Sequence, residues 1–234
     1  MRKLIIIIAM LMANLSANDI YASFNIEADK NANLAFISSG IVEKVLVDVS
    51  SEVKKDDIIA ILENSDLKAM LEVSKTALKY AKKDYNRQLK VKKIIDKSQF
   101  DKYAFKYENA KAQLKYQEAL FNKTILKAPF DGVIYEKLVE VGDAISGMML
   151  KTILKIQSKS ERKLVLTFDQ KYWKSVKIGQ TFTYSVDGDK QKYKAKISKI
   201  YPFANSKNRK IKAEVEVDGF MVGLFGDGYI SIVK

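Results

Sequence analysis

Histidine and cysteine are both absent from the 234 residues of this chain. Without histidine a Ser-His-Asp triad cannot form, and without either residue a Cys-His dyad and a conventional zinc site are excluded. The lack of cysteine also excludes disulfides and a lipid anchor on an N-terminal cysteine. Adjacent acids such as Asp56 and Asp57 fall in a predicted turn, where solvated carboxylates are typical. The sequence therefore predicts a protein that is not an enzyme and holds no cofactor or metal.

Glycine and proline are scarce, and neither occurs between Ile41 and Ala128. They are the residues that most often interrupt a helix. Within residues 65–124, two stripes of mainly apolar side chains follow a 3-4 spacing, which is typical of helices that pack along one face. The first stripe is Leu67, Leu71, Ser74, Leu78, Ala81, Tyr85 and Leu89; the second is Phe100, Tyr103, Tyr107, Ala110, Leu114, Gln117 and Phe121. We expect an antiparallel coiled-coil hairpin that extends roughly 40 Å.

An internal repeat flanks this hairpin. Residues 40–62 align without a gap on residues 132–154, at a constant offset of 92 residues. Gly40 matches Gly132, and an apolar run that ends at Leu62 matches one that ends at Leu154. A unit of about 25 residues with short alternating runs cannot bury its own apolar face. We therefore expect the two copies to close on each other as a small β-sandwich.

The chain begins with a basic start, Arg2 and Lys3, and an apolar segment at residues 4–15. Small and polar residues follow, as in a secretory signal peptide. We predict cleavage after Ala17, with Ala22 as the second choice. An uncleaved anchor is the alternative, although the apolar segment is short for a bilayer.

Positive charge dominates, with 41 Lys and Arg against 28 Asp and Glu and a net charge of +13. The lysines are spread along helix faces and strand edges, and the signal peptide argues against a nucleic-acid partner. The charge predicts a solvated lysine-rich surface, and attraction to anionic lipid head groups or to an acidic partner is the alternative.

After residue 160 the pattern changes to short alternating runs, which predict a small antiparallel barrel. Residues 18–35 give a weaker signal, of one or two strands that lead into the first β half. A helical turn is expected at 170–176, and Gly223, Gly226 and Gly228 are expected in a turn before the last strand. The candidate barrel strands are residues 164–168, 181–186, 193–201, 211–217 and 229–233.

The order of these features resembles the periplasmic adaptor subunits of bacterial tripartite efflux pumps, the membrane fusion proteins of the HlyD and RND-adaptor type. Its most specific elements are the segments 128–132, Ala-Pro-Phe-Asp-Gly, and 176–180, Val-Lys-Ile-Gly-Gln. The resemblance implies a mixed α and β multi-domain fold, in which a lipoyl-like β-sandwich is interrupted by the coiled-coil hairpin and followed by the barrel. The expected domains are a signal peptide (1–17), an N-terminal lead-in (18–35), the first lipoyl-like half (36–64), the hairpin (65–124), the second half (125–157) and the barrel (158–234).

The resemblance also implies a role. The protein is expected in the periplasm, associated with the inner membrane through a transporter that its barrel and lipoyl-like regions contact. The hairpin tip is expected to dock on a TolC-type outer-membrane channel, for export of drugs or other small compounds and hence multidrug resistance. Copies are expected to form a ring, as a hexamer or a trimer of dimers. The larger adaptors add a membrane-proximal module built from both chain ends; we expect this chain to lack it, so that contact with a transporter falls mainly to the barrel.

At the tip, the family pattern of Arg, Leu and Ser fits this chain in two registers. One places Tyr85, Leu89 and Asp96 on the pattern, and the other places Arg87, Val91 and Ser98. The candidate contact residues are therefore Arg87, Leu89, Val91, Ile95, Asp96 and Ser98. The alternative for Ile94, Ile95 and Phe100 is that they cap the core of the hairpin. In the first half, Ser50-Ser51 and Asp56-Asp57 replace glycines that the family often has, which suggests altered turns.

Two other functions remain open at this stage. A lipoyl or biotinyl carrier domain needs a modified lysine at a tight turn between its two halves, and residues 64–69 (Asn-Ser-Asp-Leu-Lys-Ala) only faintly resemble such a site. That junction is also where the hairpin is inserted. A periplasmic scaffold whose hairpin binds another coiled coil is the third hypothesis.

Overall fold

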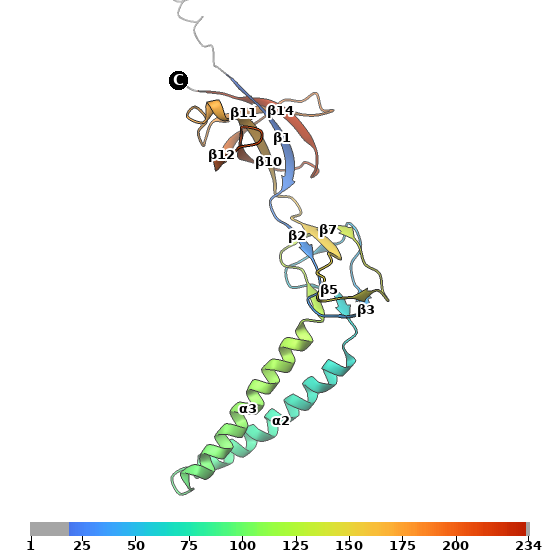
Figure 1. The fold of residues 1–234 in the computed structure, drawn as a ribbon, viewed down its shortest axis with the longest axis vertical. Helices are drawn as coiled ribbons and strands as arrows, with labels where there is room; N and C mark the ends of the chain where they lie inside the picture. Colours follow the sequence, from blue (N-terminus) through green and yellow to red (C-terminus); the bar gives the residue numbers. More distant parts are fainter. Residues whose placement is uncertain (1–18, 233–234) are drawn as a thin grey trace, which may run out of the picture. The chain divides into compact units, whose positions relative to one another are not determined.

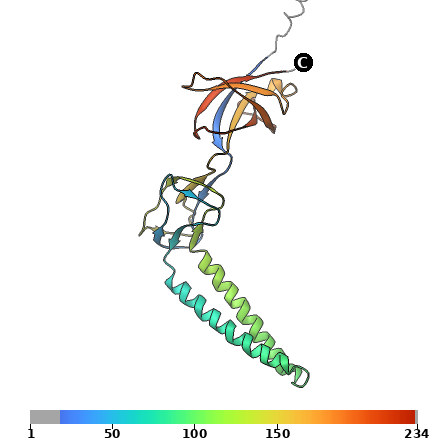
Figure 2. The same ribbon diagram turned by 180° about the vertical axis from the view of Figure 1, so that it is seen from behind.

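The computed structural model describes residues 19–232, so the predicted signal peptide lies outside the described residues. The chain divides into two compact units. One consists of residues 32–157; the other combines the residues up to 31 with those from 158 onward. Figures 1 and 2 show a barrel of strands in the second unit, and a small β-sandwich with two helices in the first. Within residues 19–232, no helix is both long enough and apolar enough to cross a bilayer.

The barrel is closed by six antiparallel strands in the order β1-β10-β13-β12-β11-β14. Side chains along β1 alternate between buried and more exposed positions, as expected for a strand with one face on a core. The closed ring leaves no free sheet edge among these strands. The strands are β1 (Ile20–Ala28), β10 (Arg162–Asp169), β11 (Thr181–Val186), β12 (Tyr193–Asn205), β13 (Lys210–Val217) and β14 (Phe225–Ile230).

Two sequence-based expectations for the barrel are corrected. Residues 18–35 were expected to lead into the first β half, but β1 closes the barrel by pairing with β10 and β14. The last strand was expected at 229–233, after a glycine turn, but Gly226 and Gly228 lie inside β14. A Cβ at either position would lie 2.2–2.3 Å from a carbonyl oxygen of the adjacent strand β11. Close backbone approach therefore explains these glycines.

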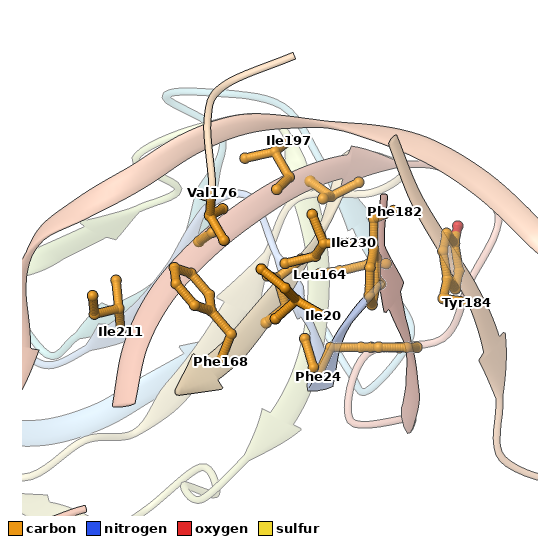
Figure 3. Close-up of a cluster of buried hydrophobic side chains, with 14 of the residues drawn as sticks. Ile20, Phe24, Leu164, Phe168, Val176, Phe182, Tyr184, Ile197, Ile211 and Ile230 are labelled. Atoms are coloured by element: carbon orange, nitrogen blue, oxygen red, sulfur yellow. The ribbon is translucent and has the colours of Figure 1, made fainter. Parts of the chain in front are cut away.

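The barrel core is a single cluster of aromatic and β-branched side chains, which Figure 3 shows from Ile211 and Phe168 to Phe24 and Tyr184. Phe24 makes edge-to-face contacts with Phe182 and Tyr184, at centroid distances of 5.9 and 5.4 Å. Such aromatic pairs add to the stabilisation from buried area. The single-turn 3-10 helix η2 (Gln170–Tyr172) follows β10, inside the helical turn that the sequence predicted.

The sandwich consists of two four-stranded sheets, in the orders β2-β9-β7-β4 and β6-β5-β3-β8. Its core includes Ile59, Leu62, Ile134 and Ile156, which are inaccessible to solvent. Both sheets mix strands from before and after the helices, so neither half has a complete core without the other. The strands are β2 (Asn31–Leu34), β3 (Gly40–Val45), β4 (Glu52–Val53), β5 (Ile58–Leu62), β6 (Ile125–Lys127), β7 (Gly132–Lys137), β8 (Ala144–Ile145) and β9 (Leu154–Gln157).

The internal repeat is confirmed for the first two strands of each copy. An offset of 92 residues maps β3 onto β7 and β4 onto β8. The second strand of each copy pairs with the first strand of the other: β4 pairs with β7, and β8 pairs with β3. The hydrogen bond from Ser50 N to Ile134 O (2.8 Å) therefore has its equivalent in the bond from Gly142 N to Val42 O (2.9 Å). The two copies are related by a local two-fold arrangement.

The gap-free alignment is wrong for the third strand. Val42 pairs with Leu62 in the first copy, whereas Ile134 pairs with Ile156 in the second, so the offset here is 94 residues. The two additional residues lie between β8 and β9, where Met148 and Met149 are 94% and 77% exposed. Residues 148–150 are apolar, so in the sequence they resemble the first residues of a strand.

The turn after the first strand keeps its shape in both copies. Ser50 has φ of 71° and its equivalent Gly142 has φ of 96°. In each copy a side chain one residue further on, Ser51 or Asp143, accepts a hydrogen bond from the backbone N–H three residues earlier, at 2.8 and 2.9 Å. The serine at position 50 thus adopts the left-handed conformation that glycine favours, and the predicted change of turn does not occur there.

Two helices of 26 residues each, α2 (Ser65–Lys90) and α3 (Lys97–Asn122), follow β5 and precede β6. Both views show them side by side and joined at their far ends. The predicted stripes are the less exposed sides of the helices, with the exception of Leu89. At their other ends, Asn64 Nδ2 donates to Thr124 Oγ1 (3.0 Å). Coiled-coil packing of this helix pair stays a prediction.

Candidate functional site

The connection between α2 and α3, with the helix turns that flank it, is the candidate site; we call residues 87–98 the helix tip. Its backbone is held by local hydrogen bonds, since the N–H groups of Ile94 and Ile95 both donate to Val91 O, at 3.0 and 3.1 Å. Asp96 is the N-cap of α3, and its carboxylate accepts from Gln99 N at 3.1 Å. This cap satisfies one of the free N–H groups of the first turn and fixes where α3 begins.

An aromatic cluster closes the helix pair just beneath the tip. Tyr85 of α2 stacks on Tyr107 of α3 with ring centroids 5.2 Å apart, and lies 5.7 Å from the ring of Phe100. Phe100 is buried, and the ammonium group of Lys92 lies 4.8 Å from the centre of its ring. Cation–π contact and aromatic packing together hold the connection against the helices.

The three apolar residues that were expected either to cap the helix core or to face a partner divide between these roles. Phe100 is buried and Ile95 is half-buried, so both contribute to the cap. Ile94 has 86% of its surface exposed. A large apolar side chain held in water by an ordered turn is a typical anchor for a partner protein.

The remaining candidate residues lie on the surface of the tip. Arg87 is exposed and pairs with Asp84 one turn before it. Leu89, Val91 and Ser98 are exposed, and Asp96 is exposed in its capping role. The structure therefore places all six candidates close together along the chain, with only Ile95 partly covered.

The two registers of the family pattern place residues of different exposure at the tip. The first register needs Tyr85 at the surface, but the ring of Tyr85 is packed between the helices against Tyr107 and Phe100. All residues of the second register, Arg87, Val91 and Ser98, are exposed. The two registers thus differ in the exposure of their first residue, and the choice between them stays a prediction.

Phe105 was not among the residues predicted from the sequence; it is 71% exposed on α3, five residues after Phe100. It lies beside a shallow groove of about 800 Å³ that Asp96, Ser98 and Tyr103 also line. The sequence could have predicted its exposure, because Phe105 lies outside the 3-4 stripe to which Tyr103 and Tyr107 belong. Phe105 therefore adds an exposed apolar side chain to the surface beside the helix tip.

The helix tip is strongly basic, because residues 87–98 contain five Lys and Arg and one Asp. Such a surface attracts an acidic partner and is sensitive to salt. Among residues 19–232, no group of three or more acidic, cysteine or histidine side chains is placed to hold a metal ion. The chemistry of the tip is that of a binding surface: apolar anchors surrounded by positive charge.

The ionisable groups with clear pKa shifts include a cluster on the barrel. Glu214 is buried and accepts hydrogen bonds from Tyr201 Oη (2.6 Å) and Lys199 Nζ (2.9 Å), with Lys163 Nζ at 3.4 Å. Burial raises the pKa of the Glu214 carboxyl, but these hydrogen bonds and the two lysines lower it by more, so its pKa lies below the usual value. The hydrogen bond to Glu214 raises the pKa of Tyr201 to about 12. The cluster is a satisfied ionic network that orients the ring of Tyr201.

Comparison with known proteins gives a family match over residues 31–156, to the CzcB-like barrel-sandwich hybrid domain. An uncharacterised protein of Haemophilus influenzae is 22% identical over 196 residues, which are 82% of this chain and 51% of that protein. The cobalt-zinc-cadmium resistance protein CzcB of Cupriavidus metallidurans is 27% identical over 135 residues, 50% of this chain and 26% of that protein. The chain thus spans about half the length of the first relative and about a quarter of the second.

Among solved structures, a MacA–MexA chimeric protein that contains the Pseudomonas aeruginosa MexA α-hairpin domain superposes with a TM-score of 0.85 and 21% identity. The match covers 93% of this chain and 83% of the chimera. At this level of identity the likeness establishes the fold.

Proposed function

Because the chain belongs to the CzcB-like barrel-sandwich hybrid family, the membrane fusion proteins or adaptors of efflux systems, we propose that it links an inner-membrane transporter to a TolC-type outer-membrane channel. In this role it is a non-catalytic subunit that bridges the periplasm. The observation that carries the proposal is the exposed Ile94 on an ordered, basic turn at the end of two long helices. A binding surface at that place is what an adaptor needs to reach a second membrane.

The helix pair acts as the arm of this adaptor. We propose that α2 and α3 pack as an antiparallel coiled coil, supported by the two facing stripes and by the stacked pair Tyr85 and Tyr107. Each helix of 26 residues is about 39 Å long. Arg87, Val91 and Ser98 then contact the channel around Ile94, with Leu89, Ile95 and Asp96 completing or supporting the surface.

The other partners follow from the same role. The transporter contacts the barrel and sandwich regions, and copies of the chain assemble side by side into a ring, as a hexamer or a trimer of dimers. Such an adaptor is exported to the periplasm by the N-terminal segment. The exported compounds are drugs or other small molecules; since the relative CzcB is named for cobalt, zinc and cadmium resistance, divalent cations are the first substrates to test.

Site-specific photocrosslinking in intact cells tests the docking surface. A photoreactive amino acid is placed at positions 87, 91 and 96 of the tip, with Lys190 in a barrel loop as the control position. We expect the tip positions to capture an outer-membrane channel protein and position 190 not to do so. Capture of cytoplasmic proteins alone, or of the channel from position 190 as efficiently as from the tip, would contradict the proposal.

Two substitutions, made in separate variants, show whether channel binding depends on the helix tip or on exposed apolar side chains anywhere on α2. Ile94→Ser removes the exposed anchor. Val73→Ser removes an apolar side chain that is 65% exposed in the first half of α2, away from the helix tip. We expect Ile94→Ser to weaken channel binding about tenfold, the effect of losing one interface anchor, and Val73→Ser to leave it unchanged. Pull-down with purified channel and an efflux assay in cells measure the two effects. Equal behaviour of the two variants would argue for the scaffold hypothesis.

A further inference from the structure

One end of the barrel, formed by residues 170–180 and 205–210, has a composition unlike the rest of the chain; we call it the basic end. The two loops lie side by side, because Asp169 pairs with Lys210 and Gln170 N donates to Arg209 O at 3.0 Å. Strand β1 begins at the same end, since it runs antiparallel to β10, and Ile20 pairs with Ile230 near the end of β14.

Charge is distributed unevenly between the two ends of the barrel. The loops of the basic end carry six Lys and Arg and no Asp or Glu. These six side chains, of Lys171, Lys174, Lys177, Lys207, Arg209 and Lys210, are all exposed. At the other end of the barrel, where β1 ends and β10 begins, the loops mix both signs, as in residues 187–192 (Asp-Gly-Asp-Lys-Gln-Lys). The basic end therefore presents a mainly positive surface that complements anions, with Asp19 and Asp169 as the acids that adjoin it.

An apolar groove opens among these charges. Its volume is about 650 Å³, and Phe168 and Ile211 of the barrel core form part of its lining. Trp173 and Phe203 also line it, although 63% and 59% of their surfaces are exposed. The groove thus joins the barrel core to two large aromatic side chains that protrude into water.

The groove is built into the backbone of the barrel. The pairing of β12 with β13 is irregular between Ile200 and Ala204, so the segment that holds Phe203 departs from regular pairing. The ring of Tyr201 packs edge-to-face on Phe203 at 6.2 Å, and its hydroxyl is fixed by Glu214. On the facing loop, Lys174 lies 5.1 Å from the ring of Trp173. Exposed aromatic rings interleaved with lysines suit the interface between lipid head groups and acyl chains, where tryptophan is enriched.

The sequence before β1 identifies the occupant of this surface. The apolar segment at residues 4–15, which is predicted to enter a membrane, joins the basic end through the few residues before Ile20. Five residues of chain span at most about 18 Å, so whatever membrane holds this segment lies close to the basic end. This tether acts only while the segment is kept as an anchor; after cleavage, the charge and the exposed aromatic rings of the basic end are what attract it to an anionic surface.

We propose that the basic end of the barrel binds the surface of a membrane that contains anionic lipids. The Lys and Arg side chains neutralise lipid head groups, and Trp173 and Phe203 insert between them. This contact is separate from docking at the helix tip and from contact with a transporter, and purified protein is sufficient to test it.

Trp173 is the only tryptophan of the chain, so its fluorescence reports on this surface alone. The purified full chain is mixed with vesicles of phosphatidylcholine, with and without phosphatidylglycerol, and with vesicles that carry brominated acyl chains as quenchers. We expect a blue shift and quenching with the anionic vesicles, loss of both at high salt, and no change with pure phosphatidylcholine. Because residues 4–15 can insert into vesicles of either composition, only a Trp173 response that is confined to the anionic vesicles and is lost at high salt supports binding by the basic end.

Charge variants test the basic end directly. Lys171→Gln with Lys174→Gln removes two exposed charges beside the groove, and Lys190→Gln with Lys192→Gln removes two exposed charges at the other end of the barrel. We expect the first pair to weaken anionic-vesicle binding at least tenfold and the second pair to leave it unchanged. Phe203→Ser should reduce the quenching of Trp173 without abolishing the salt-sensitive part of binding.

Three outcomes overturn the proposal. The protein sediments with vesicles while Trp173 emission stays that of an aqueous indole; both charge pairs weaken binding equally; or Trp173 responds only when a transporter protein is present in the vesicles. The last outcome would assign the groove to a protein partner. None of these results bears on crosslinking at the helix tip.

Discussion

The two copies of the sandwich repeat form the same strands and turns, although different residues occupy several equivalent positions. In both, β3 and β7 begin with a glycine, and the turn that follows contains a residue with positive φ. The second copy differs in three ways. Gly132 lies against the backbone of the adjacent strand, Gly142 takes the place of Ser50, and two extra residues precede the last strand. The comparison teaches that a repeat conserves hydrogen bonding more strictly than side chains or strand spacing.

The glycines that open the two copies should differ most on substitution. A Cβ at position 132 would lie 2.3 Å from the carbonyl oxygen of Gln157, whereas a Cβ at position 40 would lie 3.4 Å from the side chain of Leu62. We expect Gly132→Ala to lower the free energy of unfolding by about 3 kcal/mol, since the adjacent backbone of β9 must move. Gly40→Ala is the matched control, and we expect it to be neutral or slightly stabilising.

Chemical denaturation of both variants measures this difference. Equal effects at the two positions would mean that the copies are more alike than the structure indicates. The structural reason for the difference is that β9 runs on to Gln157 beside Gly132, whereas β5 ends at Leu62.

A smaller effect is expected at the left-handed position of the turn. Gly142→Ser places a side chain at φ of 96°, and we expect it to cost about 1 kcal/mol. The reverse change, Ser50→Gly, relieves the same conformation at φ of 71° and should be neutral or stabilising by a few tenths of a kcal/mol. Thermal unfolding of the two variants and of their combination gives the comparison; a stabilising Gly142→Ser would show that the turn is not under backbone control.

The smallest effect is expected from shortening the loop between β8 and β9, which changes the repeat offset from 92 to 94 residues. Deleting Met148 and Met149 would restore the spacing of 92 residues, and these side chains are 94% and 77% exposed. Shortening a surface loop by two residues changes its closure entropy little, so we expect the free energy of unfolding to change by less than about 1 kcal/mol. Denaturation with hydrogen-exchange protection of β9 checks this, and loss of protection in β9 would show that the extra residues set its register.

These differences also mark what the sequence could and could not predict. The equivalence of β3 to β7 and of β4 to β8 in the repeat follows from matched residues such as Gly40 and Gly132. The third strand was misplaced by two residues because Leu150 is apolar and matches Ile58 as well as a strand residue would. Only hydrogen bonds, such as Leu46 N to Ile59 O against Leu138 N to Ile153 O, distinguish the two alignments.

Other errors have the same origin in nonlocal contacts. The alternating pattern of residues 20–28 indicates a strand, but nothing local shows that its neighbours are β10 and β14. At the helix tip, the position of the turn was predictable because both stripes stop there. The opposite roles of Ile94 and Phe100 were not, because both are large apolar residues and only packing against Tyr85 separates them.

The closure of the barrel by β1 governs the order in which this chain can fold. Ile20 pairs with Ile230, so the ribosome must synthesise about 200 further residues before β1 can pair with β14. Contacts of such long sequence separation form slowly, and until then the edges of β1 and β14 stay open to pairing with other chains. The helix pair, whose contacts are local, can form first. Interruption of synthesis before β14 would therefore yield an intact arm on a protein that aggregates through its unfinished barrel.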